Sequence, residues 1–237
     1  MKRNIVSRRH MIGGCACLSL AKADAALAAA PAAKPVSISV TGAMEALDRL
    51  KAGNSRFWNG HQIHAHENAE WRNILVADQK PFATILGCSD SRVPPELVFD
   101  LGLGELFIIR LAGNIIAEDV LGSLQYAIHH LHTPLVVVMG HEGCGAVTAA
   151  VDSMLSTSHE PSHIEALLEM IKPGLTNVDL KQERKASLRS AVEANVRWSM
   201  KELLLLPEAQ RALKERRAAL VGAVYELESG KVRFLDH

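Results

Sequence analysis

Three short apolar runs mark the middle of the chain, at 83–88 (ATILGC), 106–113 (LFIIRLAG) and 135–141 (LVVVMGH). Each of them leads into a glycine or a polar loop. Continuous apolar runs of this length are typical of strands that are buried on both faces of a parallel sheet. Apolar residues recur at helical spacing between the second and third runs, in EDVLGSLQYAIHHLHT (118–133). This order predicts a strand–helix–strand crossover.

Other helices are predicted on either side of these runs. The segment AMEALDRLKAGNSRF (43–57) carries apolar residues at helical spacing, and we expect its helix to end at Gly53 and Asn54. HIEALLEMIKPG (163–174) predicts a short helix that stops at its Pro-Gly pair. A longer apolar periodicity begins at Leu188 and continues until Pro207.

The last predicted elements are two strand-like pieces in ALVGAVYELESGKVRFL (219–235), joined around Ser229 and Gly230. Polar and glycine residues between two apolar runs indicate a hairpin. We therefore predict an α/β fold with a mostly parallel central sheet, flanking helices and a C-terminal antiparallel strand.

The first 33 residues differ from the rest of the chain. They combine a basic start, the pair Arg8 and Arg9, a short apolar stretch at about 11–21 and an alanine-rich end. These features predict a twin-arginine export signal that is removed, although an ordinary basic tail is the alternative. The apolar stretch is too short to span a bilayer, so no membrane span is expected. We expect residues 34–237 to form one domain that is periplasmic or secreted.

Composition narrows the choice of partner. With 237 residues and 48% hydrophobic residues, the chain can bury one sizeable core. Its 26 basic residues balance 26 acidic ones, so no net charge draws it to nucleic acid or an anionic membrane. A small neutral substrate is the better expectation.

Two cysteines remain once the signal is removed, Cys88 and Cys144. A disulfide is one interpretation for an exported protein. However, Cys88 ends the first predicted strand, while His141 and Cys144 follow the third in GHEGCGAV. Reactive groups of open α/β sheets gather at the carboxyl ends of the strands. One imidazole and two thiolates suit Zn²⁺, and three protein ligands are typical of a catalytic zinc with one open position.

An acid and a base accompany the first cysteine in GCSDSRVPP (87–95). Residues two apart in an extended segment face the same way, so we expect Cys88, Asp90 and Arg92 to line one side of a cleft. Arg92 can hold Asp90 by a bidentate contact and keep it ionised beside the metal. A solvated surface ion pair is the alternative.

These segments together resemble the β-class carbonic anhydrases. The resemblance rests on CSDSRVPPE (88–96), LFIIRLAGNI (106–115), GHEGCGAV (140–147) and VGAVYELESGKV (221–232), with ALDRLKAGNSRF (46–57) as the opening helix. It implies zinc bound by Cys88, His141 and Cys144, with Asp90 and Arg92 as the catalytic pair. It also implies substrate contacts by Gln79 and by the Gly145 amide. Finally, it implies a homodimer or a higher even homo-oligomer.

The expected activity is the zinc-dependent, reversible hydration of CO₂ to bicarbonate and a proton. One alternative is a hydrolase that acts on carbonyl sulfide or carbon disulfide with nearly the same metal site. Another is a non-catalytic binding module that a zinc ion or a disulfide stabilises, which would give Asp90 and Arg92 no role.

Overall fold

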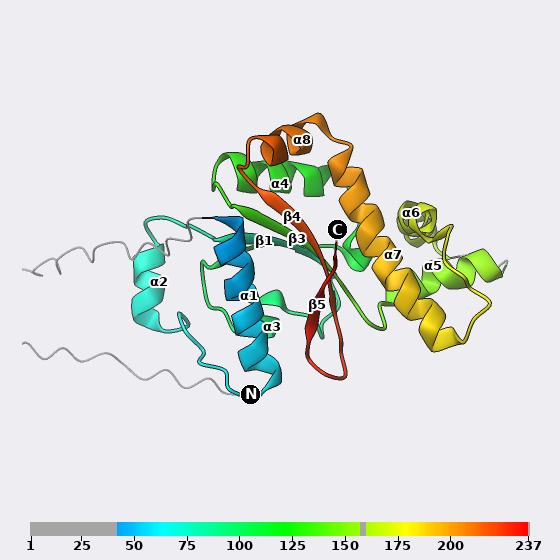
Figure 1. Ribbon diagram of the computed structural model, residues 1–237, viewed down its shortest axis with the longest axis horizontal. Helices are drawn as coiled ribbons and strands as arrows, with labels where there is room; N and C mark the ends of the chain where they lie inside the picture. The colour runs from blue at the N-terminus through cyan, green and yellow to red at the C-terminus, as the bar shows by residue number, and fades with distance from the viewer. Residues whose placement is uncertain (1–41, 157–159, 237) are drawn as a thin grey trace, which may run out of the picture. The chain divides into compact units, whose positions relative to one another are not determined.

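The structure is a computed structural model that describes residues 42–156 and 160–236 (Figure 1). The predicted export signal lies outside the described residues. The described helices and strands are, in chain order, α1 (Ala43–Trp58), α2 (Ala69–Leu75), β1 (Ala83–Gly87), α3 (Pro95–Val98), β2 (Leu106–Arg110), the 3₁₀ turn η1 (Ala112–Asn114), α4 (Glu118–His129), β3 (Leu135–His141), α5 (Gly145–Leu155), α6 (Ser162–Ile171), η2 (Lys172–Leu175), α7 (Arg184–Leu204), α8 (Pro207–Lys214), β4 (Ala219–Tyr225) and β5 (Val232–Phe234).

The strands form one sheet in the order β2-β1-β3-β4-β5. The first four strands are parallel, and only β5 is antiparallel to its neighbour β4. Every residue of β1 and of β3 is buried, which matches their continuous apolar sequences. The predicted fold class is therefore confirmed, including the crossover through α4 and the closing antiparallel strand.

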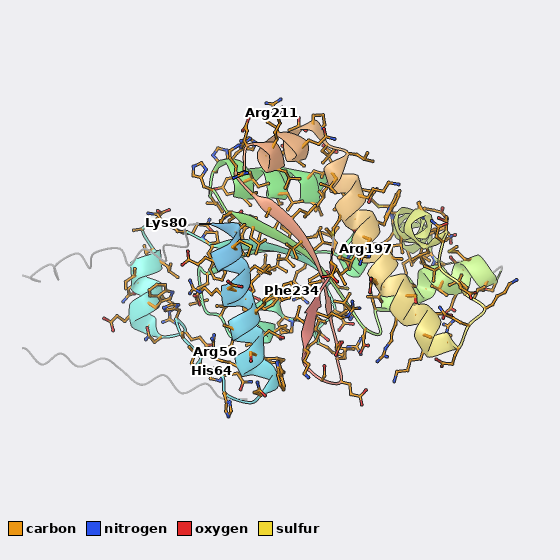
Figure 2. The ribbon with its side chains drawn as sticks, in the orientation of Figure 1. Arg56, His64, Lys80, Arg197, Arg211 and Phe234 are labelled. Atoms are coloured by element: carbon orange, nitrogen blue, oxygen red, sulfur yellow. The ribbon has the colours of Figure 1, made fainter. Side chains whose placement is uncertain are left out.

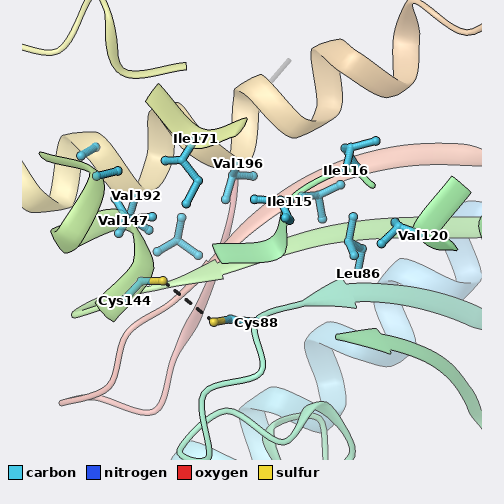
Figure 3. Close-up of a cluster of buried hydrophobic side chains, with 14 of the residues drawn as sticks. Leu86, Cys88, Ile115, Ile116, Val120, Cys144, Val147, Ile171, Val192 and Val196 are labelled. Carbon is cyan, nitrogen blue, oxygen red and sulfur yellow. Dashed lines mark hydrogen bonds between the residues drawn. The ribbon is translucent and has the colours of Figure 1, made fainter. Parts of the chain in front are cut away.

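Helices cover both faces of the sheet (Figure 1). Because successive strand residues point to opposite faces, neighbours in β1 and β3 enter different cores. Ile85 and Val137 belong to a cluster that also contains residues of α1 and α3. Leu86 and Val138 pack instead into the cluster beneath α5, α6 and α7, which Figure 3 shows in close-up.

The expected end of the first helix is wrong. Helix α1 continues through Gly53 and Asn54 to Trp58. A β-carbon at Gly53 would lie 1.8 Å from the carbonyl oxygen of Phe99, so only glycine permits this close contact with the segment after α3. Asn54 is buried and donates hydrogen bonds to the carbonyl groups of Val98 and Gly230. These two residues join α1 to distant segments rather than ending it.

Four described helices were not predicted from the sequence, namely α2, α3, α5 and α8. Pro95 starts α3, consistent with the preference of proline for a first helical position. Helix α5 starts at Gly145, directly after the second cysteine. Among the described helices, none combines the length and apolar character that a bilayer crossing requires.

Candidate metal centre

The three predicted metal ligands meet at the carboxyl end of the sheet. Cys88 follows β1 directly, His141 is the last residue of β3, and Cys144 precedes α5. Their sulfur and imidazole nitrogen atoms all lie within 4.8 Å of one another, and all three side chains are buried. The two Sγ atoms are 3.9 Å apart (Figure 3). Residues more than fifty positions apart thus form one compact cluster.

The sheet register explains this convergence. Strands β1 and β3 are parallel neighbours, with Gly87 paired to Met139, so the two chains leave the sheet at the same edge. Gly143 then adopts a φ of +63°, a left-handed conformation that glycine accepts at little cost. This turn brings Cys144 back toward His141 within three residues.

The cluster has the dimensions and the donor atoms of a zinc site. Two sulfur ligands at about 2.3 Å from a tetrahedral zinc would lie about 3.8 Å apart, close to the observed 3.9 Å between the Cys88 and Cys144 Sγ atoms. The Nδ1 atom of His141 lies 2.9 Å from the backbone oxygen of Glu142, which accepts its hydrogen bond. The buried Nε2 atom has no hydrogen-bond partner and is the nitrogen left to bind a metal.

The electrostatics of the two thiols differ. A hydrogen bond from Cys144 is the main influence that lowers the pKa of Cys88, to about 4, against the opposing effect of burial. The same bond, followed by burial, raises the pKa of Cys144. The pair therefore loses one proton readily and keeps the second, because two adjacent thiolates repel each other. A divalent cation would compensate both negative charges.

Asp90 and Arg92 lie beside this cluster, but not in the expected extended segment. β1 ends at Gly87, and the backbone N–H of Val93 donates to the carbonyl of Asp90, which closes a turn. The turn brings Arg92 back onto Asp90, whose Oδ1 accepts from Arg92 Nε at 2.9 Å and whose Oδ2 accepts from Arg92 Nη2 at 2.7 Å. The expected bidentate contact is present, whereas the expected alternation is wrong because an aspartate turn replaces the strand.

The pair is oriented toward the cluster as well. Asp90 Oδ2 lies 3.8 Å from His141 Nε2, and Arg92 Nη2 donates to the carbonyl of Gly143. Hydrogen bonds from Arg92, above all from its side chain, hold the pKa of the Asp90 carboxyl well below its usual range. Asp90 is therefore an ionised hydrogen-bond acceptor at the edge of the metal centre. The alternative of a solvated surface ion pair does not explain why Arg92 contacts Gly143 and Asp90 lies beside His141.

Arg110 is a site residue for which the sequence predicted no role. It ends β2, and its guanidinium donates to the carbonyl groups of Cys88 at 2.8 Å and Asp90 at 2.6 Å. It therefore fixes the backbone of one metal ligand and of the neighbouring acid. A charged residue at the end of an otherwise apolar strand was the available signal.

The two predicted substrate-binding residues lie in different places. Gly145 is exposed at the start of α5, next to Cys144, and the position of its absent β-carbon has no atom within 4 Å. Gln79 is also exposed, but it precedes β1, at the opposite end of this strand from Cys88. Its surroundings are Leu75, Val76 and the helix α4 residue Tyr126. Within one chain, Gln79 is thus not beside the metal ligands.

Comparisons with known proteins agree with this site. Residues 83–232 match the family model described as carbonic anhydrase. Carbonic anhydrase 2 of Mycobacterium tuberculosis is 36% identical over 201 residues, which cover 83% of this chain and 95% of that protein. The carbonic anhydrase of Pseudomonas aeruginosa is 35% identical over 173 residues, covering 68% of this chain and 76% of that protein.

Solved structures show the same fold. The β-carbonic anhydrase CafA of Aspergillus fumigatus superimposes with a TM-score of 0.65 at 26% identity, covering 81% of this chain and 90% of that one. One of two tetrameric β-carbonic anhydrases of Sordaria macrospora superimposes with a TM-score of 0.66 at 24% identity, covering 78% of this chain and 95% of that one. Together with the cysteine–histidine–cysteine cluster, these matches show that the chain belongs to the carbonic anhydrase family, in its β class.

Proposed function

We propose that this chain binds one Zn²⁺ through Cys88, His141 and Cys144 and reversibly hydrates CO₂ to bicarbonate and a proton. The observation that carries the proposal is the convergence of these three ligand atoms within 4.8 Å, with the Asp90 carboxylate 3.8 Å from His141 Nε2. Three protein ligands would leave a tetrahedral metal one open position for water.

The chain's own residues divide the remaining work. A bound zinc ion supplies a Lewis acid that makes water a stronger acid near neutral pH. Asp90, which stays ionised through its contacts with Arg92, accepts a hydrogen bond from the attacking water and orients it. Arg92 holds Asp90 in place and attaches it to the Gly143 carbonyl. Gly145 is an exposed residue next to Cys144, and its backbone amide is the expected donor to a substrate oxygen.

The alternatives explain fewer observations. The relatives described above are named carbonic anhydrases, so a hydrolase of carbonyl sulfide or carbon disulfide is not favoured. In the structure Cys88 and Cys144 are free, which does not support a disulfide-stabilised module. A non-catalytic zinc module would leave the Asp90 and Arg92 contacts without a purpose.

A homo-oligomer, a dimer or a higher even assembly, is part of the proposal. Gln79 precedes β1, whereas the metal ligand Cys88 follows it. The five residues of β1 span about 16 Å at 3.3 Å per residue, so Gln79 cannot reach the metal centre of its own chain. If Gln79 contacts substrate, it must do so in a second copy. The Sordaria macrospora structure with a similar fold is called tetrameric, which supports the same expectation.

Export by the twin-arginine route is proposed on the sequence alone. This route carries folded proteins, so zinc could be bound before the two thiols meet an oxidant, and a coordinated thiolate resists disulfide formation. Replacing Arg8 and Arg9 with lysine should retain the protein inside the cell. Unchanged export of the doubly substituted chain would contradict this part of the proposal.

The activity is tested by stopped-flow measurement of CO₂ hydration with purified protein whose zinc content is known. We expect one zinc per chain and a rate that scales with zinc content. Hydrolysis of carbonyl sulfide and carbon disulfide is measured on the same samples. Zinc-loaded protein that does not hydrate CO₂, or that prefers either sulfur substrate, would overturn the proposed function.

A further inference from the structure

Helix α7 carries two buried polar side chains on the face that packs against the core. Asn195 and Ser199 are each only 1% exposed, and they lie one helical turn apart among apolar neighbours such as Val192 and Val196. Burying an amide and a hydroxyl is unfavourable unless each finds a hydrogen-bond partner. Their partners therefore show what these two residues do.

Both side chains donate to the same short turn, η1. Asn195 Nδ2 donates to the carbonyl of Gly113 at 2.8 Å, and Ser199 Oγ donates to the carbonyl of Asn114 at 3.0 Å. Gly113 has a φ of +70° and Asn114 a φ of +44°. A glycine-containing turn in left-handed geometry has many alternative conformations, so two anchored carbonyls restrict it strongly.

The same turn contacts a metal ligand. The backbone N–H of Gly113 donates to Cys88 Sγ at 3.4 Å. A β-carbon on Gly113 would come within 2.7 Å of Ile171 and 3.2 Å of Ala146, so α6 and α5 pack closely around the turn. The position of this N–H therefore depends on α7 on one side and on the helix after Cys144 on the other.

We propose that Asn195 and Ser199 are positioning residues for the metal centre, which act through the η1 turn to keep the Gly113 N–H hydrogen-bonded to Cys88 Sγ. An N–H···S bond withdraws electron density from the thiolate, so it moderates the charge that Cys88 donates to a metal and fixes the direction of its lone pairs. The inference rests on the proposed metal site, and it assigns a role to two residues more than fifty positions from any ligand.

The chain offers a matched control on the same helix. Ser187 is 2% exposed, and its Oγ donates to the carbonyl groups of Asp179 and Gln182, away from the η1 turn. Ser187→Ala and Ser199→Ala each remove one buried hydroxyl that donates to backbone carbonyls. We expect both to lower the free energy of unfolding, but only Ser199→Ala to alter the metal centre.

The test compares the full-length wild type with Asn195→Ala, Ser199→Ala and Ser187→Ala. The zinc proteins are exposed to a chelator and the rate of zinc release is followed. Loss of a group that hydrogen-bonds to a metal ligand costs about 10- to 100-fold in metal affinity, and Asn195 and Ser199 act on such a group, the Gly113 N–H, through the η1 turn. We therefore expect roughly tenfold faster release for Asn195→Ala and about threefold for Ser199→Ala. Ser187 does not contact this turn, so its release rate should be unchanged.

The Co²⁺-substituted proteins supply a second readout. Loss of the N–H···S bond leaves more electron density on the sulfur, so the thiolate-to-cobalt absorption band should move to longer wavelength in Asn195→Ala and Ser199→Ala but not in Ser187→Ala. If Asn195→Ala does not fold, Ser199→Ala and its control still decide. The inference is overturned if the band does not move, if Ser187→Ala behaves like Ser199→Ala, or if the wild type binds neither metal. Neither readout requires CO₂ hydration, so an inactive but metal-binding protein would overturn only the proposed function.

Discussion

Ionisable groups are buried at both ends of the parallel sheet, but the two sets differ in their hydrogen-bond partners. At the amino end, Glu105 stands directly before β2 and is 1% exposed. Its carboxylate is paired with Arg49, accepts from the Gly102 N–H and lies 3.1 Å from His66 Nδ1. At the carboxyl end, the buried thiols of Cys88 and Cys144 contact each other. The buried Nε2 atom of His141 has no hydrogen-bond partner.

Asp100, also before β2, follows the pattern of Glu105. It is paired with Arg56 and accepts hydrogen bonds from the backbone N–H groups of Ile63 and His64. Arg56 and His64 lie near each other at one end of α1 in Figure 2. These two carboxylates have partners within the chain, and they join α1 and the loop after it to the segment before β2. The candidate metal centre instead has buried atoms, His141 Nε2 and the two cysteine sulfurs, that are free to bind a metal ion.

The largest expected effect comes from removing a ligand. His141→Ala leaves two thiols and no nitrogen donor, so zinc affinity should fall by more than about 100-fold, beyond the range seen for outer-shell substitutions. CO₂ hydration should disappear with it. Metal analysis after dialysis checks the first part and stopped-flow kinetics the second. A variant that keeps stoichiometric zinc would remove His141 from the ligand set.

Asp90→Asn should separate rate from metal binding. The amide keeps the shape of the side chain but is a weaker acceptor, and acid–base groups contribute about 100- to 10,000-fold to rate. We expect a loss of about 100-fold in kcat with zinc content close to that of the wild type. Comparable loss of zinc in this variant would show that Asp90 is itself a ligand.

Glu105→Gln should have the opposite profile. Hydrogen bonds to a charged group contribute about 1.5–3 kcal/mol to stability. Arg49 is partly exposed and can be solvated when its ion pair with Glu105 is lost. The free energy of unfolding should therefore fall by about 2 kcal/mol. Because Glu105 lies at the other end of the sheet, kcat per bound zinc should not change. Urea denaturation and stopped-flow kinetics on one preparation test this contrast, and a clear drop in kcat per zinc would contradict it.

The smallest expected effect concerns the exposed Arg92 and the pH dependence of stability. Arg92 depresses the folded-state pKa of Asp90, so the pair stabilises the fold above the unfolded pKa of about 3.9 and this contribution is lost as pH falls through the folded value. The stability gap between wild type and Arg92→Gln should therefore be steady above about pH 5 and narrow in more acidic solution. Urea denaturation across pH measures it, and a gap that widens on acidification would reverse the sign.

The sequence predicted much of this molecule, for identifiable physical reasons. Apolar runs reveal buried strands, and strand ends reveal where Cys88, His141 and Cys144 must gather. The sequence did not predict the hydrogen bonds from Arg110 to the Cys88 and Asp90 carbonyls or from Asn195 to the Gly113 carbonyl. It also did not predict the true end of α1. Asn195 and the Gly113 carbonyl are 82 positions apart, and Gly53 has the same local signal whether it ends a helix or permits a close helix contact. Such pairings are set by tertiary packing rather than by local pattern.

X-ray absorption at the zinc edge, on the wild type and on Asp90→Asn, tests the central claim most directly. We predict two sulfur ligands at about 2.3 Å and two lighter ligands at about 2.0–2.1 Å. The shell should be the same in both proteins, because the proposed function expects water rather than Asp90 in the open position. A shell with fewer than two sulfurs, or one that loses a light ligand in Asp90→Asn, would contradict a metal held by Cys88, His141 and Cys144 with one open position.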